Sequence, residues 1–303
     1  MLIHLQRLPM KIFLVSLLCS VASLAIEPLI NTAWLQQNID KKNLRIVEIS
    51  DKTSYESGHI KHALHTTIEK WRADNGTFIS IKNEKEIQEV IQTLGIDAST
   101  EVVLYADIQS PKDFLKASYI FWALNYHGIE NVALLDGGKQ TWIKEGAPLD
   151  KSLPQIAASN YQVKTNPALF ADRVYVERHI GKLPMIDARP GDKYLGISPT
   201  ATVKRDGHIK GAMSYPWNYS VEDDYRLKDL KKLEALFVEG YRLPKENEVL
   251  VYCTGGLETS FNYYVLSGLL GYKHVRLYDA SMKEWGNRED TPMVQYSFEV
   301  FNK

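Results

Sequence analysis

The chain has 303 residues, enough for two domains of ordinary size. A hydrophobic content of 45% and a charged content of 24% are typical of globular proteins and exclude a disordered tail, a fibrous repeat and a multi-span membrane protein. Lys and Arg number 36 and Asp and Glu 37, so no basic excess indicates a nucleic-acid partner. Two cysteines are too few for the disulfide framework of a small secreted domain.

The first 25 residues have the pattern of a cleaved signal peptide. Arg7 and Lys11 precede an apolar run over 12–25, which ends in small residues and is followed by a polar segment. The run is shorter than the roughly 20 residues that span a bilayer, although a membrane anchor, a buried helix and a lipoprotein attached at Cys19 are alternatives. We therefore expect export to the periplasm, without stable membrane insertion after cleavage. Cys253 is then the only cysteine of the mature protein, which makes it a candidate reactive thiol.

An internal repeat predicts the domain organisation. The motif GHIKHA at 58–63 recurs as GHIKGA at 207–212, and GIENVALLDGGKQTW at 128–142 recurs as GYKHVRLYDASMKEW at 271–285. Matched blocks in the same order indicate two copies of one unit, each of single-domain size. The expected divisions are a signal peptide at 1–25, a first domain at 26–147, a linker at 148–160 and a second domain at 161–303.

Short apolar runs alternate with segments of helical periodicity along both copies. This alternation predicts an α/β fold in which each copy forms a mainly parallel sheet with helices on both faces. Ligands of such sheets bind at the carboxyl ends of the strands. The predicted strands lie at 44–49, 101–106, 131–135, 184–188, 248–253 and 274–278, and the helical patterns at 87–96, 113–128, 227–241 and 259–272.

The loop at the end of the strand 248–253 carries the candidate chemistry. Gly255 and Gly256 allow a tight turn whose backbone N–H groups point inward, and a predicted helix begins directly after it. Both features favour an anion on Cys253, either a thiolate or a persulfide. A buried, unreactive cysteine is the alternative. The candidate substrate- and persulfide-binding loop comprises Thr254, Gly255, Gly256, Leu257, Glu258 and Thr259.

These motifs resemble the tandem-domain rhodanese family, the thiosulfate and 3-mercaptopyruvate sulfurtransferases. The resemblance covers 30–295 and rests on GHIKHA and GHIKGA, TAWL in the first copy, and IDARP, VYC and LYDASMKEW in the second. It implies two rhodanese-like domains, of which the second carries the catalytic Cys253. The first, with Ala106 at the corresponding position, is catalytically silent. The resemblance further implies that Cys253 takes a sulfane sulfur from thiosulfate or 3-mercaptopyruvate as a persulfide and passes it to a thiol or cyanide. No metal or organic cofactor is implied.

Five positions depart from the family pattern, among them Ala280 and Met282, which replace the usual Gly and Trp of the last motif. Glu258 stands where the family has Arg or Thr, and its carboxylate would repel an anionic donor unless it turns to solvent or is protonated. Gly255 replaces the Lys or Ser typical of the two donor classes, so the loop selects no donor. Lys193 stands where the family has a substrate-binding Arg, and it lacks the bidentate fork; a solvated surface lysine is the alternative. A catalytically weak or inactive sulfur-carrier or binding protein is therefore the alternative function.

The remaining conspicuous residues predict structural roles. Asp187 and Arg189 are expected to form an ion pair beside a strand end. His59 and His208 occupy matched positions in both copies, which favours a role in folding, and a contact in the domain cleft is the alternative for His59. The other histidines lack metal-ligand spacing. A cysteine phosphatase would need an Arg where Thr259 stands.

Overall fold

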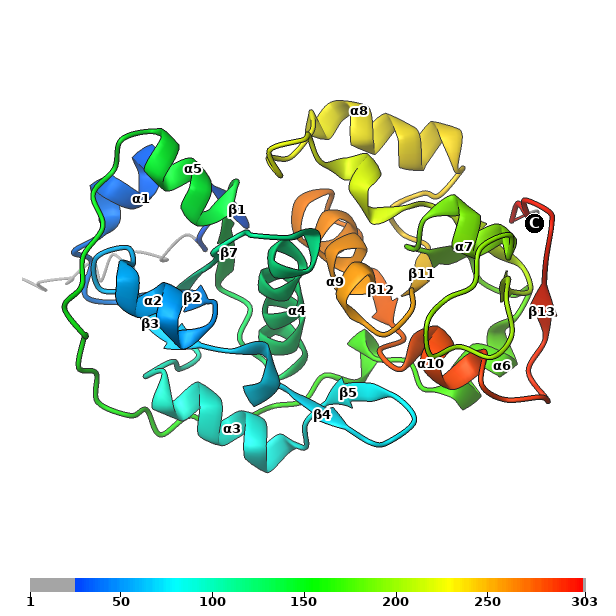
Figure 1. Cartoon of the computed structure of the whole chain (residues 1–303), viewed down its shortest axis with the longest axis horizontal. Helices are drawn as coiled ribbons and strands as arrows, with labels where there is room; N and C mark the ends of the chain where they lie inside the picture. The colour runs from blue at the N-terminus through cyan, green and yellow to red at the C-terminus, as the bar shows by residue number, and fades with distance from the viewer. Residues whose placement is uncertain (1–24, 302–303) are drawn as a thin grey trace, which may run out of the picture.

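The computed structural model describes residues 25–301, and each half of this range contains its own parallel sheet (Figure 1). The predicted signal peptide, apart from Ala25, lies outside the described residues and stays a prediction. Within 25–301, no helix is both long and apolar enough to cross a membrane. The α/β class and the helix-covered parallel sheets are confirmed.

The first sheet has five strands in the order β1-β7-β6-β2-β3, all parallel. Its central strands β2 and β6 are continuous apolar runs because helices cover both faces of the sheet. Their register places Glu48 beside Tyr105 at the carboxyl ends. The strands are β1 (Leu29–Ile30), β2 (Leu44–Ile49), β3 (Leu64–Thr66), β6 (Glu101–Ala106) and β7 (Val132–Leu135).

The second sheet repeats this arrangement with four parallel strands in the order β10-β8-β11-β12. Its register places Asp187 beside Tyr252, the residue before the cysteine. Its strands are β8 (Met185–Asp187), β10 (Ala212–Ser214), β11 (Glu248–Tyr252) and β12 (His274–Leu277).

Two small antiparallel pairs lie outside these sheets. The pair β4 (Arg72–Asp74) and β5 (Ile79–Ile81) forms a hairpin that extends from the first half to the second (Figure 1). The pair β9 (His208–Ile209) and β13 (Met293–Val294) joins the second GHI motif to the C-terminal segment. The predicted strands all occur, β2 and β6 with the predicted bounds and the other four one or two residues shorter, whereas β1, β3, β10 and these pairs were not predicted.

Polar side chains cap several helices at their first residues. Asn83 Oδ1 accepts a hydrogen bond from the Glu86 N–H at 3.1 Å, and Asp229 Oδ1 accepts one from the Lys232 N–H at 3.0 Å. The α-helices are α1 (Thr32–Asn38), α2 (Lys52–Ser57), α3 (Glu84–Thr93), α4 (Pro111–Tyr126), α5 (Gly138–Lys144), α6 (Arg173–His179), α7 (Gly191–Leu195), α8 (Leu230–Ala235), α9 (Leu257–Tyr263) and α10 (Ser281–Trp285). Helices α8 and α9 continue as π-helical turns at Leu236–Gly240 and Tyr264–Leu269.

A single apolar core joins the two halves. Helices α4 and α9 pack side by side between the sheets (Figure 1), and one buried cluster contains residues of both halves. Phe114 lies 5.0 Å from Phe261 and Phe121 lies 4.9 Å from Tyr264, measured between ring centroids. The outer face of each sheet has its own apolar cluster. Because of this packing, loops of the first half lie next to the second sheet.

The chain between the halves has no helix or strand over 151–166. Its start is fixed to the first half, because the His59 and Asp150 backbones exchange two hydrogen bonds, of 2.9 and 2.7 Å. The predicted domain boundaries at 147 and 160 stay a prediction.

Candidate active site

Cys253 lies at the carboxyl end of β11, and the chain turns around its sulfur atom. The backbone N–H of Gly255 donates to Sγ at 3.3 Å and that of Gly256 donates to Sγ at 3.1 Å. The residue is 1% exposed, so these donors act on a sulfur that is almost free of water. Helix α9 begins at Leu257, and its first turn faces the loop. The expected turn of inward N–H groups is therefore present.

Glycine is required at the second N–H donor. Gly256 has φ +94°, a conformation that L side chains rarely adopt, and a Cβ there would lie 2.0 Å from Asp279 Oδ1. The loop therefore passes close to a buried carboxylate on the side away from the sulfur, and no larger residue fits between them.

Ser281 fixes the backbone of Cys253 through hydrogen bonds. Its Oγ accepts from the Cys253 N–H at 3.0 Å and donates to the Tyr278 carbonyl at 2.6 Å. Ser281 has φ +52°, an unfavourable conformation for a residue with a Cβ. These two hydrogen bonds stabilise that conformation and fix the start of the loop. Nothing in the sequence pattern singled out this residue.

Burial changes the ionisation expected for the cysteine. Desolvation, followed by the charge of Glu258, raises the pKa of the Cys253 thiol to about 11, although Thr259 and the Gly255 N–H act in the opposite direction. The sequence predicted a stabilised thiolate because the loop donors were evident and the complete burial was not. Burial therefore acts against the thiolate that the loop donors favour.

Glu258 faces the loop rather than solvent. It lies on the first turn of α9, is half-buried, and is close enough to Cys253 for each group to influence the other's ionisation. Burial, which outweighs a hydrogen bond with Cys253, raises the pKa of the Glu258 carboxyl. Of the two arrangements considered from the sequence, the structure therefore contains the inward one, in which burial makes the carboxyl harder to ionise than a surface glutamate.

Several buried polar atoms around the loop make no hydrogen bond with the residues that the structure describes. Thr259 is fully buried on α9, and its hydroxyl makes no hydrogen bond with any residue of 25–301. The same holds for Arg72 Nε and Asp279 Oδ1 on the other side of the loop. Buried polar groups are nearly always satisfied in folded proteins, so these three atoms are free to hydrogen-bond a polar ligand or water at the loop.

The comparisons with known proteins identify the family of the chain. A family model described as Rhodanese-like domain matches residues 31–145 and again 171–288. The chain belongs to the rhodanese family. It is 34% identical over 284 residues to a protein of Thermus thermophilus named sulfur carrier protein TtuD, across 89% of this chain and 97% of that protein. It is 29% identical over 277 residues to a putative thiosulfate sulfurtransferase of Synechococcus elongatus, across 88% of this chain and 85% of the relative.

Solved structures share the fold of this tandem rhodanese. A crystal structure of YnjE superposes with a TM-score of 0.78 at 20% identity, covering 89% of this chain and 68% of that one. A variant of EanB in complex with hercynine superposes with a TM-score of 0.80 at 20% identity, covering 89% and 70%. At this identity the likeness extends to the fold alone.

The predicted Asp187–Arg189 ion pair is confirmed. Arg189 Nε lies 2.9 Å from Asp187 Oδ1, Nη2 lies 2.5 Å from Oδ2, and Nη2 also donates to the Gly207 carbonyl at 2.8 Å. Burial opposes the charge of Arg189, but Asp187 holds the pKa of the guanidinium above its usual value. The pair is internally satisfied and joins β8 to the second GHI motif.

Two other candidate residues lie elsewhere. Lys193 Nζ donates to the Pro199 carbonyl at 2.8 Å, and no hydrogen bond or ion pair links it to the cysteine loop. His59 is fully buried, stacks on Tyr55 at 4.0 Å, and has its ring nitrogens 2.9 and 3.0 Å from the carbonyls of Tyr55 and Ser152. A cleft contact of His59 is therefore wrong, because the ring ties α2 to the segment after the first domain.

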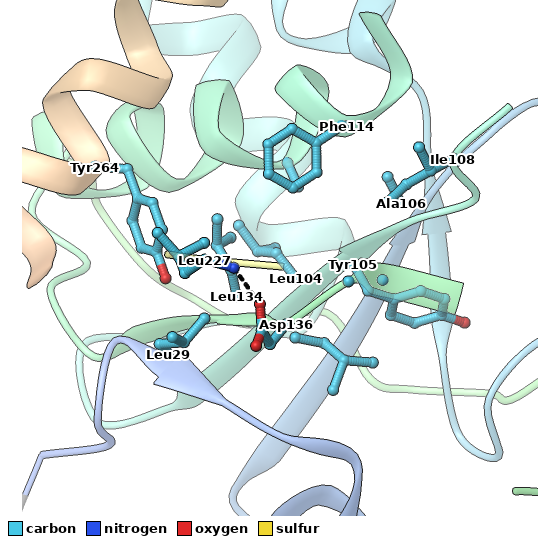
Figure 2. Close-up of a pocket in the computed structure, with 14 residues that line it drawn as sticks. Leu29, Leu104, Tyr105, Ala106, Ile108, Phe114, Leu134, Asp136, Leu227 and Tyr264 are labelled. Carbon is cyan, nitrogen blue, oxygen red and sulfur yellow. Dashed lines mark hydrogen bonds between the residues drawn. The ribbon is translucent and has the colours of Figure 1, made fainter. Parts of the chain in front are cut away.

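The first rhodanese-like domain has a small, mainly apolar pocket at the position of the cysteine loop (Figure 2). Ala106 ends β6 there, and no cysteine is present. The pocket closes against the second domain, where the Leu227 N–H donates to Asp136 at 3.1 Å. Its lining includes Leu29, Leu104, Tyr105, Ala106, Ile108, Phe114, Leu134, Asp136, Leu227 and Tyr264.

Sequence reasoning missed the contribution of the first domain to the active site. Arg72, on the β4–β5 hairpin, donates through Nη2 to the Gly255 carbonyl, 183 residues away in sequence. Asp279 accepts from the Ile81 N–H and from the Tyr119 hydroxyl, each at 2.7 Å. The repeat had marked Asp279 as matched to Asp136, which was a usable signal, but no pattern pointed to Arg72.

Proposed function

We propose that this protein is a sulfurtransferase that carries a sulfane sulfur on Cys253. The observation that carries the proposal is the pair of N–H donors, from Gly255 and Gly256, directed at Sγ within 3.3 Å. Such donors stabilise negative charge on sulfur, which a persulfide carries more readily than a buried thiol. The orphaned Thr259 hydroxyl is a further donor for an incoming anion. The names of the relatives agree with sulfur transfer.

The reaction takes two balanced steps. The Cys253 thiolate attacks the outer sulfur of a donor such as thiosulfate, a sulfur–sulfur bond forms, and sulfite leaves with the electron pair of the broken bond. An acceptor thiolate or cyanide then attacks the outer persulfide sulfur, and the thiolate of Cys253 is regenerated. With 3-mercaptopyruvate, the carbon–sulfur bond breaks and pyruvate leaves after protonation. Neither step requires a metal or organic cofactor.

Glu258 supports a second candidate, a sulfur carrier with slow turnover. Its carboxyl lies beside the nucleophile and adds to the desolvation that raises the pKa of the Cys253 thiol, which disfavours the thiolate. A relative at 34% identity is named a sulfur carrier protein. This candidate would be loaded with sulfur as the first candidate is, but it would release that sulfur to a specific partner rather than to small thiols.

The decisive experiment is intact mass measurement after exposure to thiosulfate and, separately, to 3-mercaptopyruvate. We expect a gain of one sulfur atom that peptide mapping places on Cys253, that cyanide removes, and that Cys253→Ser abolishes without unfolding the protein. A gained sulfur that cyanide removes but small thiols do not supports the carrier. Absence of the gain with both donors, or unchanged transfer in Cys253→Ser, contradicts the proposal.

We also propose that residues 1–25 direct export to the periplasm and are then removed. The support is the charged start, the apolar run and the small residues before position 26. Cell fractionation of the expressed full chain, followed by N-terminal sequencing, tests this. A cytoplasmic protein that retains Met1 contradicts it.

A further inference from the structure

The β4–β5 hairpin of the first domain ends against the back of the cysteine loop. Arg72 Nη2 donates to the Gly255 carbonyl and, at 3.2 Å, to the Ile79 carbonyl, and it lies 3.5 Å from Asp279 Oδ1. The guanidinium also lies over the Tyr119 ring, 4.6 Å from its centroid. The Arg72 side chain is 9% exposed and that of Asp279 is fully buried. This is a built contact between two domains rather than a surface ion pair.

The geometry of the peptide bond gives this contact a consequence for the sulfur. Gly255 O and Gly256 N belong to one planar trans peptide, in which the C=O and N–H point in opposite directions. The carbonyl is held by Arg72 on one side, and the N–H donates to Cys253 Sγ at 3.1 Å on the other. A charged donor on the carbonyl polarises the peptide and strengthens the hydrogen bond made by its N–H.

We infer that Arg72 is a positioning residue of the active site: the first domain's guanidinium orients and polarises the Gly255–Gly256 peptide so that its N–H stabilises negative charge on Cys253. The catalytically silent domain thereby takes part in the chemistry of the second domain without touching the substrate. This inference deepens the proposed function and rests on it for the role of the persulfide. The orientation of the peptide toward the sulfur is a property of the free protein.

Because charged groups surround the sulfur, a test must distinguish a change in the ionisation of the Cys253 thiol from a loosening of the loop. Glu258 on α9 opposes a negative charge on Cys253, whereas Arg72 and Arg189 favour it, and Asp187 and Asp279 each neutralise one of these arginines. The Lys283 side chain on α10 also packs against the loop at Gly255, and it is unchanged in every variant of the test. Removal of Arg72 therefore leaves Glu258 and an unpaired Asp279 near the loop. The thiol should then become harder to ionise, which is a direction that mere loosening of the loop does not produce.

The test is alkylation of Cys253 by iodoacetamide between pH 7 and 9.5, followed at the Cys253 peptide of the full chain. In Arg72→Met we expect alkylation roughly ten-fold slower at each pH, equivalent to a one-unit rise in the pKa of the thiol. Loosening of a cysteine that is 1% exposed would instead accelerate alkylation. Arg226→Met is the control, because Arg226 lies beside Asp136 at the equivalent contact of the silent domain and should leave the rate unchanged.

Arg72→Lys keeps the test valid if Arg72→Met does not fold. A lysine retains the charge opposite Asp279 but lacks the planar guanidinium that lies over the Tyr119 ring, so alkylation should be slowed about three-fold, by a smaller shift of the thiol pKa than in Arg72→Met. Unfolding in urea confirms that each variant is folded. Folded Arg72→Met and Arg72→Lys with wild-type rates would overturn the inference. Because alkylation needs no sulfur donor, failure of sulfur loading in the wild type contradicts the proposed function alone.

Discussion

The two rhodanese-like domains share a frame at the end of their central strands, a buried tyrosine beside a carboxylate. They differ in the residues that follow the strand. In the first, the Tyr105 hydroxyl donates to Glu48 at 2.5 Å and accepts from the Ile60 N–H at 3.0 Å. In the second, Tyr252 lies beside Asp187 in the sheet and accepts from the Ile209 N–H at 3.1 Å. Each domain thus binds its own GHI motif through a buried tyrosine. The frame is therefore a requirement of folding rather than of chemistry.

The difference lies in the residues that follow the strand. In the first domain Lys139 Nζ lies 3.0 Å from Glu48 and 3.4 Å from Asp107, the residue directly after Ala106. Burial raises the pKa of Asp107, but hydrogen bonds from Ser54 and other neighbours outweigh it and hold the pKa below its usual value. A fixed carboxylate thus follows β6, whereas the second domain has a loop of N–H donors. The two domains therefore differ by a few loop residues: the loop of the second can bind an anion, whereas the loop of the first carries the Asp107 carboxylate.

The reciprocal contacts between the domains are also unequal, and this predicts the largest effect. Asp279 is buried against Arg72, whereas Asp136 is half-buried and accepts a hydrogen bond from the Leu227 N–H. We expect Asp279→Ala to lower the free energy of unfolding by about 3–5 kcal/mol, because it leaves a buried arginine without its counterion. Asp136→Ala should cost about 1 kcal/mol. Urea unfolding of both variants measures the difference, and equal losses would show that the two contacts are energetically equivalent.

The carboxyl beside the nucleophile predicts the next largest effect. Glu258→Thr removes a charge that raises the pKa of Cys253, so the thiol ionises at lower pH. Below the thiol pKa, alkylation and sulfur uptake from thiosulfate should accelerate, by roughly ten-fold for each unit that the pKa falls. Glu258→Gln, which keeps the size of the side chain, is the matched control and should act in the same direction. A slower reaction in both variants would instead give Glu258 a favourable role, such as accepting the thiol proton.

Moving the cysteine to the first domain, without the loop that surrounds it in the second, is predicted to have the smallest effect. In a Cys253→Ser background, Ala106→Cys places a thiol at the silent strand end, beside Asp107 and without the donor loop. We expect no sulfur uptake from thiosulfate and a change in the free energy of unfolding below about 1 kcal/mol, because only one sulfur atom is added. Intact mass and urea unfolding measure both. A persulfide on the introduced thiol would mean that the frame, and not the loop, provides the reactivity.

The sequence predicted those parts of the fold that have a long local signal. The strands β2, β6, β7, β8, β11 and β12 were found because continuous apolar runs are typical of strands covered on both faces. Strands of two residues, such as β1 and β9, are too short for any periodicity to appear. The repeat gave the two-domain architecture, since it matched blocks that lie far apart in the chain.

The site was predictable only within its own loop. The position of Cys253 and the role of Gly255 and Gly256 followed from the strand end and the two glycines. The inward direction of Glu258 did not follow, because a helix N-terminus accepts an acidic residue facing either way. Arg72 could not be found from the sequence, since its approach to the loop depends on the packing of one domain against the other.

The packing of α4 against α9 also limits how this chain can evolve. Ser118 and Ser260 meet between the helices at 3.1 Å, and the aromatic rings around them come from both copies. Either copy alone would present this apolar face to water, so neither can be deleted, although one has no nucleophile. Selection on the silent copy therefore acts on its shape. Position 106 at the end of its β6 strand needs no nucleophile, while its α4 surface and the Arg72 hairpin are held by the copy that has the cysteine.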